Sequence, residues 1–387
     1  MNYIVISPYY PQNFQAFSLE LAKQGITVLG IGQEPYEQLD QPLKEALTEY
    51  FRVDDLENLD EVKRAVAFLF YKHGPIDRIE SHNEYWLELD AALRTQFNVF
   101  GVKSSDLMKT KLKSQMKTYF KKAGVPVVPG QVVTKKADVA QAVKALGLPL
   151  IAKPDNGVGA VATYKLASQA DVKAFTEQWN EETAYFFEAF VNSNQICTYD
   201  GLVDAEGKIV FATSLIYTEP PMSIMQHRSD VAYYTNPKIP KKLEGYGRQI
   251  VDTFGMKERF FHIEFFQEAD DYIAIEYNNR PAGGFIMDAY NFGYSINLFE
   301  QYARLVAGKD FQPSNYPAQL ALTVIRRDDK TYHYSETQIL EQYKPQLKAR
   351  LRMPEAFAAL QGNDLYLLNA NSEQDVKDMI KTISQLA

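Results

Sequence analysis

The sequence has very little cysteine and lacks any long apolar run. Among its 387 residues Cys197 is the one cysteine, which excludes an internal disulfide and is typical of a reducing compartment. No stretch approaches the roughly 20 apolar residues that span a bilayer. The start, MNYIVISPYYPQ, has no basic segment before its short apolar run. These absences argue against a membrane protein and predict a soluble, cytoplasmic one.

Positive charge is also in short supply. Lys and Arg number 41 against 49 Asp and Glu, a net charge of −8, and this balance argues against a general nucleic-acid binder. The composition, 46% hydrophobic and 23% charged, is that of an ordinary globular protein. A chain of this length is too long for one core, so we expect two or three domains.

The first hundred residues alternate strand-like and helix-like stretches. Short β-branched runs at 3–7, 26–32 and 76–81 are separated by segments with apolar residues at helical spacing, 13–25 and 61–74. This rhythm predicts βαβ units and a Rossmann-like parallel sheet over residues 1–104. The first loop, SPYYPQNF, has no glycine fingerprint, which disfavours a bound dinucleotide.

A lysine-rich helix is predicted over 104–124. Its apolar stripe leaves Lys111 at the flank, where it can reach into a cleft. Lys113, Lys117 and Lys121 fall on the opposite side, which favours a solvated face for these three.

A glycine-rich loop follows in the segment 148–166. Gly157 and Gly159 follow a strand that carries Lys153, and the β-branched stretch AVATYKL comes after them instead of a helix. Two strands joined by such a loop suggest a flap over phosphates, because exposed backbone N–H groups and a lysine bind anions. A plain hairpin is the alternative.

Carboxylates and an amide converge in a second hairpin, RFFHIEFFQ followed by DYIAIEYNNR. Glu264 lies in the first strand, Glu276 and Asn278 lie in the second, and Arg280 ends the pattern. Oxygen ligands of this kind suit Mg²⁺, which usually shares phosphate oxygens. Arg280 is then placed to stabilise a transferring phosphoryl group. The alternative is a salt-bridged sheet face.

In this order, the motifs resemble those of the ATP-grasp superfamily. A helix lysine, a strand lysine before a glycine loop, an E-x-x-V hinge at Glu188–Val191 and the paired carboxylate strands follow one another between about 105 and 310. The resemblance implies an α/β and α+β fold with three parts. These are an N-terminal pre-ATP-grasp domain (1–104), an ATP-grasp domain (105–310, with a lid at about 125–190) and a small C-terminal α/β subdomain (311–387).

The resemblance also implies roles for individual residues. Lys111 and Lys153 would contact the phosphates of ATP under the lid. Glu188, with the backbone around Phe190 and Val191, would bind adenine. The family often has an acid for the ribose seven residues after the hinge glutamate, where this chain has Gln195.

For the metal the resemblance implies two Mg²⁺ ions, with Mn²⁺ as a possible substitute. Glu264 would bind one ion, Glu276 would bridge both and Asn278 would bind the second. His262, beside this set, is expected to be a packed histidine and not a ligand.

Two loops are candidates for contact with the substrate. Glu80, Asn83 and Glu84 follow a strand at the carboxyl edge, where open α/β sheets bind ligands. His227 and Arg228, in MQHRSD, are the second candidate. For each loop an ordinary surface role is the alternative.

The function implied is an ATP-dependent ligase that activates a small carboxylate as an acyl phosphate and joins it to an amine or thiol. Two alternatives stay open, a formyl or carboxy transfer to a purine precursor and an ATP-binding regulatory protein without turnover. The expected partners are ATP and small molecules, with no nucleic acid or membrane, and a homodimer is possible.

Overall fold

A four-stranded parallel sheet begins the chain. The structure is a computed structural model, and it describes residues 1–157, 162–193, 195–220, 223–224 and 227–387. The sheet has the order β3-β2-β1-β4. Its strands are β1 (Asn2–Ile6), β2 (Thr27–Gly32), β3 (Glu49–Arg52) and β4 (Arg78–Glu80). Its helices are α1 (Gln15–Lys23), α2 (Gln41–Ala46), α3 (Leu59–His73) and α4 (Leu87–Gln96), with short 3₁₀ turns η1 (Gln12–Phe14), η2 (Tyr36–Gln38) and η3 (Glu84–Trp86).

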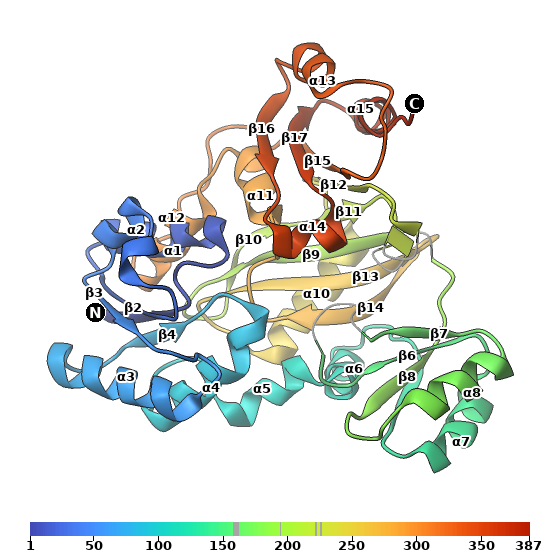
Figure 1. Ribbon diagram of the computed structural model, residues 1–387, viewed down its shortest axis with the longest axis horizontal. Helices are drawn as coiled ribbons and strands as arrows, with labels where there is room; N and C mark the ends of the chain where they lie inside the picture. Colours follow the sequence, from blue (N-terminus) through green and yellow to red (C-terminus); the bar gives the residue numbers. More distant parts are fainter. Residues whose placement is uncertain (158–161, 194, 221–222, 225–226) are drawn as a thin grey trace.

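Both faces of this sheet are covered. Tyr3 and Val5 of β1 pack in the core that contains α1, whereas Ile4 and Ile6 pack in the core that contains α3. Successive strand residues point to opposite faces, so a strand that is apolar throughout needs helices on both sides. The Rossmann-like arrangement predicted for the N-terminal part is confirmed (Figure 1).

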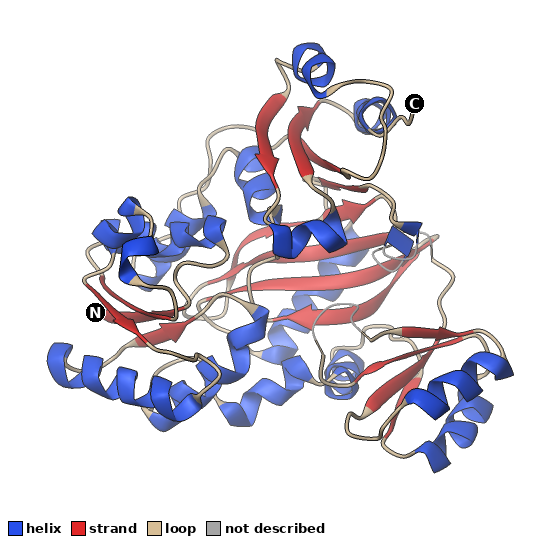
Figure 2. Ribbon diagram, in the orientation of Figure 1, coloured by secondary structure: helices blue, strands red, loops and turns tan. Residues whose placement is uncertain are grey.

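A second four-stranded sheet lies in the segment that we predicted to be the lid, and we keep that name for it. Its four strands are antiparallel, in the order β5-β8-β6-β7, and two helices cover it at one corner of the molecule (Figure 2). The strands are β5 (Gly130–Val133), β6 (Leu150–Pro154), β7 (Tyr164–Leu166) and β8 (Tyr185–Ala189), and the helices are α7 (Lys136–Leu146) and α8 (Gln169–Gln178). The antiparallel pairing of β6 with β7 agrees with the predicted flap. Gly159 lies outside the described residues.

A nine-stranded sheet forms the body. Its path is β14-β13-β9-β11-β12-β15-β17-β16, with β10 beside β9. The strands are β9 (Ile196–Val203), β10 (Ile209–Thr213), β11 (Leu215–Tyr217), β12 (Val231–Thr235), β13 (Arg259–Glu268), β14 (Asp271–Asn278), β15 (Leu320–Arg326), β16 (Leu347–Arg352) and β17 (Asp364–Ala370). The helices around it are α10 (Lys241–Phe254), α11 (Ile286–Tyr294), α12 (Leu298–Val306), α13 (Glu336–Gln342), α14 (Glu355–Gln361) and α15 (Glu373–Ile383).

The C-terminal strands belong to this same sheet. We expected residues 311–387 to form a small unit packed on the main body, but β15 pairs along β12 from Val231↔Ile325 to Tyr234↔Leu322. β15 then pairs with β17, which pairs with β16. The hydrogen-bonded ladder is therefore continuous from the middle of the chain to its C-terminal part.

The lysine-rich segment is broken at Leu112. Helix α5 (Ser104–Lys111) ends there and α6 (Lys113–Lys122) begins, because Leu112 is extended (φ −82°, ψ 119°) and forms a bridge with Asn156. The Lys113 N–H donates to the carbonyl of Asp155 at 3.0 Å. The single helix expected over 104–124 is thus two helices, and the loop after β6 interrupts them.

Strand β14 lies at one edge of the body sheet, and the chain itself covers part of that edge. Val127 bridges Ala274 in parallel, and the Ala274 N–H donates to the carbonyl of Pro126 at 2.9 Å. Lys117 Nζ donates to the Ala274 carbonyl at 3.0 Å. Among the described residues, no helix is long and apolar enough to cross a membrane.

Buried ion pairs join the N-terminal part to the body sheet. The Glu80 carboxylate, at the end of β4, contacts the guanidinium groups of both Arg94 (2.6 Å) and Arg259. Burial acts to raise the pKa of Glu80, but the two arginines outweigh it and lower this pKa. Nearby, Arg78 Nε donates to Glu258 Oε1 at 2.6 Å. These contacts fix the position of the loop after β4 relative to β13.

Candidate active site

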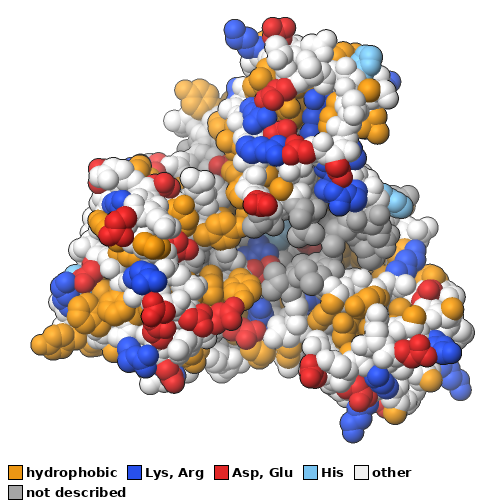
Figure 3. All heavy atoms as spheres, viewed as in Figure 1, with side chains coloured by type: hydrophobic (Ala, Val, Ile, Leu, Met, Phe, Trp, Pro, Cys, Tyr) orange, Lys and Arg blue, Asp and Glu red, His pale blue; other side chains and the backbone are white. Residues whose placement is uncertain are grey.

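A cavity of about 410 Å³ lies between the lid and the body sheet. The space-filling view shows the molecule hollowed where its N-terminal part, lid and C-terminal part meet (Figure 3). The lid contributes Lys153 from β6 and Glu188 from β8, and the body sheet contributes Glu264 from β13 and Glu276 from β14. Two different sheets thus supply charged side chains to the same cavity.

The two carboxylates lie directly opposite each other on neighbouring strands. In the antiparallel register Glu264 pairs with Glu276 and His262 pairs with Asn278, so the hairpin brings the predicted oxygen ligands together at one end of the cavity. Burial raises the pKa of Glu276, as do the nearby Glu84 and Glu264, while Lys113 opposes them. Two facing carboxylates repel each other unless a cation lies between them.

This donor set fits Mg²⁺. Among the residues described, no three His, Cys, Asp or Glu side chains are grouped so as to hold a metal by themselves. Two carboxylates and an amide are hard oxygen donors, and magnesium commonly takes one or two carboxylates and completes its shell with water and substrate phosphates. The site therefore suits an ion that arrives with a nucleotide, and not a permanently caged one.

His262 holds one of these carboxylates in place. Its Nδ1 lies 2.8 Å from Asp200 Oδ1 and its Nε2 lies 3.3 Å from Glu264 Oε1. Burial acts to lower the pKa of His262, but the Asp200 and Glu264 carboxylates outweigh it and raise this pKa to about 10. The ring is buried, in agreement with the packed histidine expected from the sequence.

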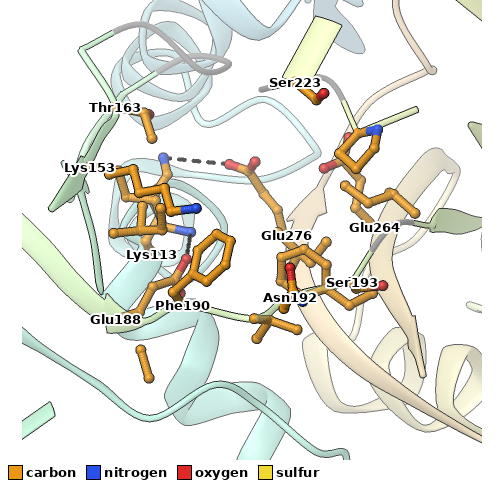
Figure 4. Close-up of a pocket in the computed structure, with 18 of the residues that line it drawn as sticks. Lys113, Lys153, Thr163, Glu188, Phe190, Asn192, Ser193, Ser223, Glu264 and Glu276 are labelled. Atoms are coloured by element: carbon orange, nitrogen blue, oxygen red, sulfur yellow. Dashed lines mark hydrogen bonds and ion pairs between the residues drawn. The ribbon is translucent and has the colours of Figure 1, made fainter. Parts of the chain in front are cut away.

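On the lid side, Glu188 is held by two lysines. Lys153 Nζ lies 2.5 Å from Glu188 Oε1 (Figure 4). Lys117 Nζ lies 3.4 Å from Glu188 Oε2. Burial lowers the pKa of Lys117 to about 8, although Glu188 acts in the opposite direction. This group of charges keeps Lys153 at the wall of the cavity, facing the carboxylate pair.

Comparison with known proteins identifies this architecture. Residues 146–288 match the family model of the ATP-grasp domain. Over these residues the chain is similar to an ATP-grasp domain. An L-arginine-specific L-amino acid ligase from Bacillus subtilis is 24% identical over 268 residues, 67% of this chain and 64% of that relative. The chain thus spans just under two thirds of the curated relative's length.

Solved structures share the fold over almost the whole chain. An L-amino acid ligase from Bacillus licheniformis has a TM-score of 0.74 at 14% identity, covering 98% of this chain and 97% of that one. The ADP complex of an N5-carboxyaminoimidazole ribonucleotide synthetase has a TM-score of 0.71 at 13% identity, covering 99% and 96%. At these identities the likeness shows the fold, and it confirms the predicted fold class.

The lysines of α5 and α6 face different surroundings from those predicted. Lys113 lines the cavity, with Nζ 3.6 Å from Glu276 Oε1 and 3.0 Å from the carbonyl of Gly157, and Figure 4 shows the two side chains meeting. Lys111 does not line it, and its Nζ lies 3.6 Å from Glu88 Oε1. The solvated face expected for Lys113 and Lys117 is wrong, since both are 4% exposed, whereas Lys121 is exposed as predicted.

The break at Leu112 explains this error. A continuous helix would have put Lys113 and Lys117 opposite the apolar stripe, but the extended residue resets the helical phase and turns both inward. The sequence gives no signal for the break, because Leu112 is apolar and falls on the expected stripe.

Substitution separates the two lysines. We expect Lys113→Met to raise the KM for ATP about tenfold or more, because it removes a buried charge that faces the phosphate-binding space. Lys111→Met is the matched control, expected to change that KM by less than about threefold, because its pair with half-exposed Glu88 is weak. ADP release measured over a range of ATP concentrations gives the KM of each variant. A larger increase in KM for Lys111→Met than for Lys113→Met would support Lys111 as the phosphate contact instead.

The three substrate candidates at and after the end of β4 lie in three different environments. Glu84 pairs with the guanidinium of Arg280, and both line the cavity. Glu80 instead belongs to the buried pairs with arginines, so its carboxylate is already engaged. Asn83 Oδ1 accepts the Tyr85 N–H at 3.0 Å, which caps η3.

The two residues predicted from the second loop do not reach the cavity. His227 and Arg228 are exposed and neither lines it. Arg228 pairs with Asp329, in the loop after β15, at 2.6 Å on the surface. Pro220 and Ser223, earlier in the same loop, line the cavity instead, a difference that charge-based reading of the sequence cannot find.

Phe190 and Val191, for which the resemblance implies contact with adenine, line the cavity. Lys165 Nζ lies 3.8 Å from the Phe190 ring centroid, and no motif in the sequence pointed to this lysine. Gln195, the ribose candidate, is not among the lining residues, and its carbonyl accepts the Gln267 N–H at 3.0 Å.

Proposed function

We propose that this protein is an ATP- and magnesium-dependent ligase that activates a small carboxylate and joins it to an amine. The observation that carries the proposal is the opposed pair Glu264 and Glu276, which faces Lys113 and Lys153 across one cavity. Carboxylates that hold divalent cations beside lysines that neutralise phosphate charge are the groups that phosphoryl transfer needs.

In this proposal the lid and hinge hold the nucleotide. The apolar side of Phe190 and Val191 takes the adenine, with Glu188 beside it as acceptor for the amino group. Lys113 and Lys153 contact the phosphates, beside Gly157, whose carbonyl accepts a hydrogen bond from Lys113 Nζ. Lys113 takes the role that the resemblance implied for Lys111, because Lys113 faces the carboxylates.

The metal ligands are Glu264, Glu276 and Asn278, for up to two Mg²⁺ ions. Bound magnesium would polarise the phosphate oxygens and reduce their charge. His262 orients Glu264 through its hydrogen bond, so this carboxylate needs no rearrangement when the nucleotide enters.

Arg280 then stabilises the charge on the transferring phosphoryl group. A carboxylate is a poor electrophile, and phosphorylation gives it a leaving group that an amine can displace. The lid over the cavity excludes water, which would hydrolyse the acyl phosphate. The relative's name suggests L-amino acids as the first substrates to test, because each carries both a carboxylate and an amine.

Release of ADP tests the proposal. Wild-type protein with Mg²⁺-ATP is mixed with pairs of L-amino acids, and ADP and phosphate are measured. A signal that needs an amino acid supports the ligase. ADP release that no carboxylate stimulates, from protein shown separately to bind ATP, would contradict it and favour the regulatory alternative.

A further inference from the structure

The helix that carries Lys113 begins after a residue that cannot cap it. The first backbone N–H groups of an α-helix have no partner within the helix, and a polar side chain just before the helix usually accepts from them. Leu112 holds this position before α6, and its side chain has no oxygen. Lys113 is the first residue of α6, so the group that caps this helix also fixes the backbone from which the Lys113 side chain extends.

Asp155, from a distant part of the sequence, supplies the cap. Its carbonyl accepts the Lys113 N–H at 3.0 Å, and its carboxylate accepts both the Ser114 N–H and the Ser114 hydroxyl at 2.8 Å. The Asp155 side chain belongs to a buried residue, 6% exposed. A carboxylate in this place also interacts favourably with the positive end of the helix dipole. Asp155 thus completes the first turn of α6.

The segment 155–157 holds Lys113 at both its ends. Asp155 accepts from its backbone N–H, and the carbonyl of Gly157 accepts from its Nζ at 3.0 Å. The same Nζ lies 3.6 Å from Glu276 Oε1. A lysine side chain loses rotamer freedom when it binds a ligand, and a lysine that is already held loses less of it.

Asp155 also connects the two lysines that we propose as phosphate contacts. Lys153 lies on β6, two residues before Asp155, and the Asp155 N–H donates to the Ala184 carbonyl of the lid at 2.9 Å. Lys113 belongs to α6, which packs in the core of the body sheet. Figure 4 shows both lysines at one side of the cavity, with Glu264 at the other. The bonds of Asp155 therefore hold a lysine of the lid and a lysine of the body in a fixed relation.

We propose that Asp155 is a positioning residue, which fixes Lys113 against the lid so that Lys113 and Lys153 bind the phosphates of ATP as one preformed pair. Asp155 acts through Lys113, and its own carboxylate needs no contact with the nucleotide. Such preorganisation increases affinity because less freedom is lost on binding. The inference rests on the nucleotide contact proposed for Lys113, and it adds a residue to which no motif in the sequence pointed.

Nucleotide binding in the absence of amino acid tests this role. Calorimetric titration of the full chain compares Mg²⁺-ATP with adenosine, which has no phosphate. We expect Asp155→Ala to weaken ATP binding about 5- to 30-fold, as for a lost helix cap, and to change adenosine binding by less than about twofold. Asp155→Asn keeps an oxygen that can accept the Ser114 N–H, so its ATP affinity should stay within about threefold of the wild-type value.

Two further variants separate positioning from general support of the lid. Asp155→Ala combined with Lys113→Met should bind ATP about as weakly as Lys113→Met alone, because Asp155 acts through that lysine. Asp171→Ala is the matched control. Asp171 completes the capping box of the lid helix α8, where its carboxylate accepts the Ser168 N–H at 2.8 Å, and it does not line the cavity. This control should leave the ratio of ATP affinity to adenosine affinity unchanged.

If Asp155→Ala does not fold, Ser114→Ala carries the same test. It removes only the hydrogen bond from the Ser114 hydroxyl, so we expect ATP binding to weaken about two- to tenfold and adenosine binding to stay the same. An unchanged ATP affinity in a folded Ser114→Ala variant would count against the role of the Asp155 carboxylate.

Three results would each overturn the inference. These are equal losses of ATP and adenosine affinity in Asp155→Ala, losses that multiply in the double variant, and an Asp155→Asn variant that binds ATP as weakly as Asp155→Ala. A selective loss of ATP affinity, in a protein whose wild type releases no ADP with any carboxylate, would sustain the role of Asp155 and contradict the ligase. Carboxylate-dependent ADP release by the wild type, with ATP affinity unchanged in Asp155→Ala, would do the reverse.

Discussion

Glu276→Gln is expected to lower ATP turnover by about a thousand-fold or more and to leave the fold intact. The substitution keeps the shape of the side chain but removes the charge that would bridge the two metal ions, and losing about 4 kcal/mol of transition-state stabilisation corresponds to that factor. ADP release with saturating amino acid substrate measures the loss.

Glu276→Gln is expected to lower turnover but not stability. Burial and the nearby Glu84 and Glu264 raise the pKa of Glu276, so its ionised form is unfavourable in the folded protein. A neutral glutamine should therefore keep or raise the melting temperature. Glu268→Gln, at the turn end of the same hairpin and outside the cavity, is the control for both measurements. Turnover near the wild-type rate in Glu276→Gln would remove the residue from the proposed metal site.

Arg259→Met should destabilise the protein by about 3–5 kcal/mol, because it leaves the buried carboxylate of Glu80 with one of its two cations. The Arg259 Nε also donates to the Asn279 carbonyl at 3.1 Å, so the strand end next to Arg280 loses a support. Urea unfolding followed by circular dichroism measures the change in the free energy of unfolding.

An exposed arginine provides the comparison. Arg248 pairs with Glu244 at 2.8 Å one helical turn away, with side chains 51% and 37% exposed, and Arg248→Met should cost no more than about 0.5 kcal/mol. Adding Glu80→Gln to Arg259→Met should restore part of the lost stability, because the uncompensated charge is then gone. Similar losses for the two arginine variants would show that the buried network contributes little.

The sequence predicted best those features that depend on neighbours along the chain. The alternating pattern of Glu264, Glu276 and Asn278 needs only strand periodicity and one short turn, and the register places the two glutamates opposite each other. The N-terminal parallel sheet followed in the same way from strand and helix rhythm. Both faces of that sheet are buried, so its strands are apolar throughout and easy to recognise.

What the sequence could not predict depends on contacts between distant residues. Glu80 looks like a substrate contact until Arg259, 179 residues away, pairs with it. Lys113 looks solvated if the helix is continuous. In the structure, Leu112 bridges Asn156 and the Lys113 N–H donates to the carbonyl of Asp155, so the helix is interrupted just before Lys113. We expected a separate C-terminal subdomain over 311–387, because period-2 alternation carries no information on which sheet a strand joins.

The position of β14 at the edge of the body sheet also bears on self-association. An unpaired edge strand is a template on which another chain can add a strand, the first step of aggregation. Here residues 126–127 take up part of that template, and the ammonium of Lys117 occupies the Ala274 carbonyl. The same lysine also pairs with Glu188. One side chain thus both orders the lid carboxylate and keeps the strand that carries Glu276 from pairing with a second molecule.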